Sequence, residues 1–127
     1  MARLLAALAC AAALVALTGC GESDQEKARE VVQDYVDARN DSDYQRACDL
    51  YSDDFKEELG ASANCAAFLE EQSSGADVGG EFSLVEVRVN EDRAIGEIDV
   101  TQEGQGPSRI GVILSRDGDS WKISGLQ

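Results

Sequence analysis

The chain has 127 residues, of which 25 are acidic, 11 are basic and none is histidine, and its net charge at pH 7 is −14. This length fits one domain and a short leader. The negative electrostatic field of such a chain repels phosphate backbones and anionic lipid head groups. This argues strongly against nucleic-acid binding and against electrostatic docking on a membrane. Without histidine the commonest general base and metal ligand are missing, so we expect neither a metal site nor a cofactor.

Residues 1–19 form a predicted secretory signal peptide. Arg3 precedes an apolar stretch over residues 4–17, which is shorter than the about 20 residues that a membrane-spanning helix needs. A positive start, a short apolar middle and small residues at the end are typical of an export signal. Its removal would leave 25 acidic and 10 basic residues, a net charge of −15 on residues 20–127.

The leader ends in Leu17, Thr18, Gly19 and Cys20, which resemble the lipobox of bacterial lipoproteins. The resemblance implies a diacylglyceryl thioether on the nucleophilic thiol of Cys20 and cleavage between Gly19 and Cys20. Residues 20–22 would then be a lipidated tether on the extracytoplasmic face of the cell membrane, since two acyl chains give a stable anchor. The alternative is an ordinary secretory cleavage site that precedes a cysteine.

Two of the four cysteines remain for the folded domain. Cys10 is lost with the leader and Cys20 is taken by lipid, which leaves Cys48 and Cys65 as an even pair in an oxidising compartment. We predict a disulfide between them, worth roughly 3 kcal/mol in the chain-entropy model. A metal site or a redox couple is the alternative, but no Cys-x-x-Cys motif or histidine supports it.

A long first helix is predicted after the tether. Ser23 and Glu26 match a capping box, and the apolar residues that follow have helical spacing on an otherwise charged segment. We expect this helix to stop at Asn40 in a left-handed conformation.

Three shorter helices follow, with Cys48 and Cys65 on apolar faces, so that a disulfide would join two helices on their core side. The predicted caps of these helices are Ser42, Ser52 and Ser62.

The pattern changes to strands after residues 73–80. Apolar and polar residues alternate in four segments: 81–90, 94–101, 110–114 and 121–123. Phe82 and Leu84 are out of phase with Val85 and the alternating valines that follow, which predicts a β-bulge near residues 84–85. The pair Asp117-Gly118 is a hairpin signal.

Helices followed by a four-stranded antiparallel meander are an α+β arrangement, with the helices packed on one face of the sheet. The helical block at residues 28–59, the paired Cys48 and Cys65, and the closing "DGDSWKISGL" resemble small bacterial lipoproteins with a nuclear-transport-factor-two-like (cystatin-like, SnoaL-like) domain. The resemblance covers residues 23–127. It implies a curved sheet wrapped on the first helix, forming a cone with a pocket at its open end.

Enzymes of this fold, such as ketosteroid isomerases and polyketide cyclases, place polar groups inside the cone. An isomerase needs a carboxylate base there. The strand acids Glu86, Glu97 and Asp99 alternate with the apolar set and should face solvent, unless the register is shifted by one residue. We therefore assign no catalytic residue. The possible pocket-lining or core positions are Tyr35, Tyr51, Phe68 and Trp121.

We expect a non-enzymatic envelope lipoprotein whose cone binds a small apolar ligand or another protein. The alternatives are an enzyme of the isomerase or cyclase type and a purely structural assembly module acting through its acidic face. An enzyme predicts a buried carboxylate in a pocket. A ligand carrier predicts an apolar cavity of about a few hundred Å³, and an assembly module predicts an exposed apolar patch.

Overall fold

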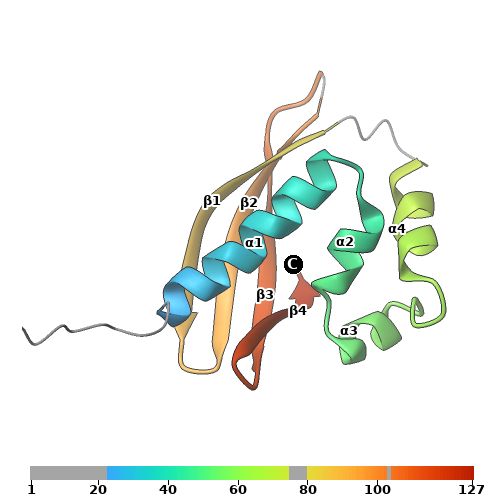
Figure 1. The fold of residues 1–127 in the computed structure, drawn as a ribbon. Helices are drawn as coiled ribbons and strands as arrows, with labels where there is room; N and C mark the ends of the chain where they lie inside the picture. The colour runs from blue at the N-terminus through green and yellow to red at the C-terminus, as the bar shows by residue number, and fades with distance from the viewer. Residues whose placement is uncertain (1–22, 75–79, 103) are drawn as a thin grey trace, which may run out of the picture.

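The computed structural model describes residues 23–74, 80–102 and 104–127 (Figure 1). In these residues, helices come first and strands follow. The helices are α1 (Asp24–Asn40), α2 (Tyr44–Asp49), α3 (Asp53–Glu58) and α4 (Cys65–Ser74). The strands are β1 (Glu81–Asn90), β2 (Arg93–Thr101), β3 (Ser108–Asp117) and β4 (Ser120–Leu126).

The strands form one antiparallel sheet in the order β1-β2-β3-β4, which confirms the predicted meander. Helix α1 crosses one face of this curved sheet, and α2, α3 and α4 lie beside it on the β4 side (Figure 1). The main chain after α2 pairs with β4, because the amide of Ser52 donates to the carbonyl of Ile123 at 2.8 Å and the amide of Ile123 donates to that of Leu50 at 2.8 Å.

The hydrophobic core lies between the helices and the inner face of the sheet. Each described helix and strand contributes buried side chains to it, among them Val32 of α1, Leu69 of α4 and Ile123 of β4. The described residues thus supply a core together with the elements that cover it, which is what a domain needs to fold by itself.

Helix α1 approaches β2 closely at Gly96. A Cβ atom built on Gly96 would lie 2.8 Å from Cγ2 of Val32 and 3.0 Å from its Cγ1. Real Cβ atoms do not come so close, and the branched side chain of Val32 is fully buried and stiff. The missing side chain of Gly96 therefore sets the distance between helix and sheet.

The far end of α1 is tied to the start of β1 by Asn40. Its side-chain amide donates to the carbonyl of Phe82 at 2.9 Å, and its side-chain oxygen accepts from the amide of Phe82 at 2.8 Å. The helix ends at Asn40 as predicted, but the predicted left-handed conformation of Asn40 is wrong, because Asn40 is still helical and the positive φ of 55° occurs at Ser42. Asn40 serves the long-range contact instead.

The helix caps agree with the sequence at two of four positions. The side chain of Ser23 accepts from the amide of Glu26, and that of Ser52 accepts from the amide of Phe55, as predicted. The predicted caps at Ser42 and Ser62 are wrong. Their places are taken by Asp43, which accepts from the amide of Arg46, and by Asn64, which accepts from the amide of Ala67. None of the helices in the described part of the chain is long and apolar enough to cross a membrane.

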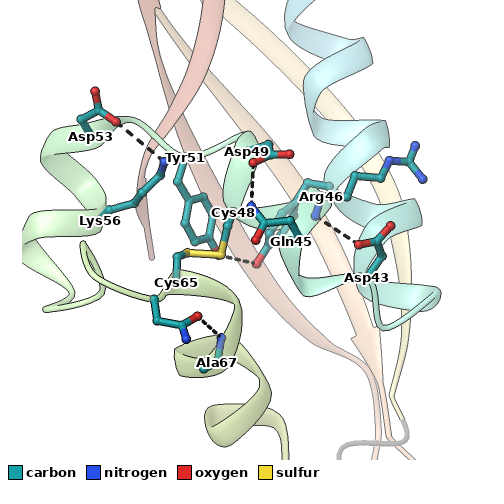
Figure 2. The surroundings of a disulfide bond; sticks show 12 residues. Asp43, Gln45, Arg46, Cys48, Asp49, Tyr51, Asp53, Lys56, Cys65 and Ala67 are labelled. Carbon is teal, nitrogen blue, oxygen red and sulfur yellow. Dashed lines mark hydrogen bonds and ion pairs between the residues drawn. A yellow bond between two sulfur atoms is a disulfide. The ribbon is translucent and has the colours of Figure 1, made fainter.

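A disulfide joins α2 to the first residue of α4. Figure 2 shows the bond between Cys48 and Cys65, whose Cα atoms are 5.9 Å apart, with Tyr51 beside it. Cys48 is 1 % exposed. The predicted bridge on the core side of two helices is confirmed.

The strand alternation follows the prediction on the inner face. The register of β1 against β2 shifts between Leu84 and Glu86, which confirms the bulge. Val85 is the extra residue and is 38 % exposed, so its expected inward position is wrong. A second register shift, between Ile113 and Leu114 against β4, has no counterpart in the sequence pattern.

We predict that Gly96→Ala lowers the free energy of unfolding by about 1–3 kcal/mol, because the added methyl group overpacks the contact with Val32. Gly111→Ala is the matched control, since a Cβ there meets its nearest atom, Cβ of Gln127, at 3.5 Å. Chemical denaturation of the two variants measures the difference. Val32→Ala should lower the free energy of unfolding less in the Gly96→Ala background than in the wild type. Equal losses for Gly96→Ala and Gly111→Ala would contradict this account.

Candidate functional site

A cavity of about 250 Å³ lies between the second half of α1 and the inner face of the sheet. Five of its lining side chains are aliphatic or phenyl groups, and three are polar. Its lining consists of Tyr35, Arg39, Phe82, Ile98, Val100, Gln102, Ile110 and Leu126. Ile98 is 1 % exposed, whereas Leu126 is 41 % exposed and lies at the rim.

The position of the cavity follows from the way α1 sits on the sheet. Beyond the contact of Val32 with Gly96, α1 and β2 continue toward the same end of the molecule, where β2 connects to β3 (Figure 1). Tyr35 and Arg39 come one and two turns later on α1, and Ile98 and Val100 come two and four residues later on the same face of β2. The cavity lies between these two pairs.

Two of the three polar side chains of the cavity, Tyr35 and Arg39, lie on α1, and the third, Gln102, follows the end of β2. The hydroxyl of Tyr51, behind the wall, is 3.3 Å from that of Tyr35. The guanidinium of Arg39 lies 5.0 Å from the ring centre of Phe82 and 6.0 Å from that of Tyr35, and it donates to Oγ of Ser73 at 3.4 Å. The cavity thus has an apolar wall and one polar corner made of hydrogen-bond donors.

Tyr51 belongs to the structural support of this corner. Burial raises the pKa of its hydroxyl far above the usual value, and the neighbouring Tyr35 raises it further. Its ring also packs edge-on against Phe55, with ring centres 5.0 Å apart. Tyr51 is therefore a neutral hydroxyl at physiological pH, held between α1 and α3.

The acids of the strands lie on the outer face of the sheet, opposite the cavity. Arg109 forms ion pairs with Asp99, at 2.9 Å, and with Glu97, at 3.6 Å, and Arg88 pairs with Glu86 at 3.0 Å. The hydrogen bond from Arg109 lowers the pKa of Asp99 and raises that of Arg109 itself. The predicted register is confirmed, and the register shifted by one residue is wrong.

The aromatic residues singled out in the sequence occupy different places. Tyr35 lines the cavity and Tyr51 is behind it. Phe68 is half-buried on α4 and packs against the core. Trp121 is 3 % exposed on β4, where Arg116 lies 5.1 Å from its ring centre, and it does not line the cavity. Leu17, Thr18, Gly19 and Cys20 of the lipobox lie outside the described residues.

Sequence reasoning did not select Arg39, Gln102 or Leu126 for the site. Arg39 could have been found, because it follows Tyr35 by four residues and such pairs share a helix face. Leu126 pairs with Val112 only because of the register shift within β3 and β4, so its inward position had no signal in the alternation. Gln102 lies beyond the last residue of β2, where the period-two pattern gives no direction.

A wider groove of about 600 Å³ lies between α3 and the β3–β4 hairpin. Its lining mixes acids and bases, for example Asp53, Arg116 and Lys122. Ligand sites are mostly apolar with a few convergent polar groups, which describes the smaller cavity better. In the part of the chain that the structure describes, no group of three or more cysteine, aspartate or glutamate residues could hold a metal ion.

Comparison with solved structures identifies the fold. An NTF2-like designed protein, Rd1NTF2_05 with five substitutions, matches with a TM-score of 0.57 and 16 % sequence identity. The match covers 83 % of this chain and 98 % of the designed chain. The nuclear-transport-factor-two-like α+β fold is thereby shown. No family model matches the sequence, and no curated protein matches it.

We predict that Tyr51 makes the protein less stable at alkaline pH. Its pKa is raised in the folded state, so above a pH of about 10 the unfolded chain releases this proton while the folded protein retains it. The stability that the neutral hydroxyl contributes is present below the unfolded pKa and is lost as the pH rises above it.

Unfolding in denaturant at pH 8 and at about pH 11 measures this loss. Tyr51→Phe should show a smaller loss than the wild type, whereas Tyr44→Phe, at a half-buried position packed against the core, should lose stability as the wild type does. Equal losses in all three proteins would show that Tyr51 ionises freely in the folded state.

Proposed function

We propose that this protein is a lipid-anchored, extracytoplasmic binding protein whose cone holds one small, largely apolar ligand. The observation that carries the proposal is the cavity of about 250 Å³ with its apolar wall and single polar corner. Apolar lining with a few placed polar groups is the usual character of a small-molecule site. The NTF2-like fold supports the proposal, because its curved sheet provides the concave surface.

The geometry favours binding over the isomerase or cyclase alternative. Proton abstraction next to a carbonyl needs a carboxylate base that faces the substrate. The strand acids Glu86, Glu97 and Asp99 face away from the cavity and are paired with arginines. The polar side chains in the described lining, Tyr35, Arg39 and Gln102, are suited to hold an oxygen atom of a ligand.

The proposed anchor agrees with the place of the cavity. Helix α1 begins with its cap at Ser23, three residues after Cys20. At 1.5 Å per residue, Arg39 lies about 22 Å along α1 from Asp24. An anchor on Cys20 would therefore hold the end of α1 that is remote from the cavity, and the mouth would remain open to the aqueous phase.

Ligand binding is tested with octan-1-ol, a neutral probe, on residues 23–127 secreted without the anchor. Methyl NMR should show shifts at Ile98, Val100 and Ile110, which line the cavity. Val100→Phe fills part of the cavity and should weaken binding by about tenfold, because about two methylenes of the probe would lose their apolar contacts at a cost of about 0.8 kcal/mol each.

Val89→Phe is the matched control for this experiment. Val89 lies on the inner face near the other end of β1 and packs against the core outside the cavity. Both variants must keep a dispersed spectrum of a folded protein. The binding proposal would be overturned if octan-1-ol did not shift the signals of the cavity methyl groups, or if it shifted them equally in Val100→Phe.

The anchor is tested by feeding a clickable fatty acid to a bacterial host that expresses the full chain. The wild type and Cys10→Ala should incorporate the label, since Cys10 is lost with the leader. Cys20→Ala should incorporate none, because the acceptor thiol is gone. A labelled Cys20→Ala protein, or an unlabelled wild type, would show that Cys20 is not the lipid attachment site.

A further inference from the structure

The cavity wall contains a positive charge, Arg39, that no carboxylate among the described residues offsets. Of the ion pairs between residues that the structure describes, none includes Arg39. The side chain is half-buried, and its surroundings are the rings of Tyr35 and Phe82, the neutral hydroxyl of Tyr51 and a long hydrogen bond to Ser73, none of which carries a negative charge. A guanidinium that is partly removed from water and unpaired is unfavourable unless something else supplies a counter-charge.

The other arginines show that acids are not scarce. Four of them are in ion pairs: Arg46 with Asp34, Arg88 with Glu97, Arg109 with Asp99 and Arg116 with Asp24. Arg29 and Arg93 are exposed to water, which solvates their charge. With 25 acidic residues against 11 basic ones, Arg39 is the exception among the described arginines: it is half-buried and faces a cavity whose described lining has no carboxylate.

We infer that the ligand is a small monocarboxylate with an apolar chain. This inference rests on the proposed function and specifies its ligand class. The carboxylate would accept two parallel hydrogen bonds from the planar fork of Arg39, the geometry that arginine offers to such groups. The chain of the ligand would lie against Val100, Ile110 and Leu126, which line the same cavity.

Size and charge narrow the class further. The volume of about 250 Å³ is below the range of about 300–1,000 Å³ that is typical for drug-sized ligands, so one short chain fits and a large fused-ring system does not. The protein carries a strong net negative charge, which disfavours dianions and phosphates. A single negative charge next to Arg39 meets the guanidinium at contact distance, where the more distant acids are largely screened by salt.

A purely structural role for Arg39 makes a different prediction. Arg39 lies in the last turn of α1, where a cation interacts favourably with the helix carbonyls and with the aromatic rings beneath it. In that case Arg39→Gln would change the stability of the protein and would not change its preference between a carboxylate and an alcohol of equal chain length.

The test compares octanoate, octan-1-ol and octylamine as probes of residues 23–127, with binding followed by methyl NMR. The wild type should bind octanoate about tenfold more tightly than octan-1-ol, because hydrogen bonds to charged groups are stronger than neutral ones, and octylamine should bind most weakly. Arg39→Gln should bind octanoate no more tightly than the alcohol. Arg88→Gln, which removes a charge on the outer face, should keep the preference.

A second measurement needs no variant and covers the case in which Arg39→Gln fails to fold. The Nε–H signal of Arg39 in the wild type should shift on addition of octanoate and should not shift with octan-1-ol. Suppose that octan-1-ol binds in the cavity, but octanoate binds no better or leaves the Nε–H signal unchanged. The inference of a monocarboxylate ligand is then wrong, and the binding proposal stands. If neither probe reaches the cavity methyl groups, both proposals fail.

Discussion

The contact between Val32 of α1 and Gly96 of β2 determines how the rest of this protein is arranged. A residue with a side chain at position 96 would place its Cβ 2.8 Å from Val32, so the helix lies as near to the sheet as backbone and valine permit. Asn40 fixes the far end of the helix with two hydrogen bonds to Phe82. Between these two attachments the larger side chains of Tyr35 and Arg39 face the sheet, and the space that they leave is the cavity.

The two faces of the sheet divide the charged residues between them. On the outer face, acids and arginines pair across neighbouring strands, as Asp99 and Arg109 do. Such exposed pairs contribute little stability, but they keep the strand acids on the side that faces away from the cavity. On the inner side, Arg39 is near aromatic rings and hydroxyl groups. A protein with a large excess of acids thus presents a cation, and no carboxylate among the described lining residues, to whatever enters its cone.

Local patterns predicted the elements of this fold well, because helix caps, period-two alternation and a phase break are written in neighbouring residues. The bulge at Val85 was predicted in this way. The disulfide between Cys48 and Cys65 was predicted instead from the number of cysteines left for the folded domain. Two caps were misplaced because serine, aspartate and asparagine cap helices about equally well. In the run Asn40 to Asp43, Asn40 bonds to Phe82 of β1 and Asp43 caps α2.

The cavity could not be located from the sequence for a different reason. Its width depends on how far α1 stands from β2, which is a property of packing between segments about 60 residues apart. Its rim depends on Leu126, whose direction follows from a register shift that the apolar pattern of β3 does not reveal. Aromatic residues were the natural candidates, yet Phe68 and Trp121 are used in the core, and the residue that gives the site its chemical character is Arg39.

A crystal structure of the octanoate complex tests the central claim most directly. The account predicts that the carboxylate oxygens lie about 2.7–2.9 Å from the guanidinium nitrogens of Arg39, with the alkyl chain along Ile110 and Leu126. Octanoate bound in the groove between α3 and the β3–β4 hairpin, or a cavity closed by its own side chains while the probe remains in solvent, would contradict it.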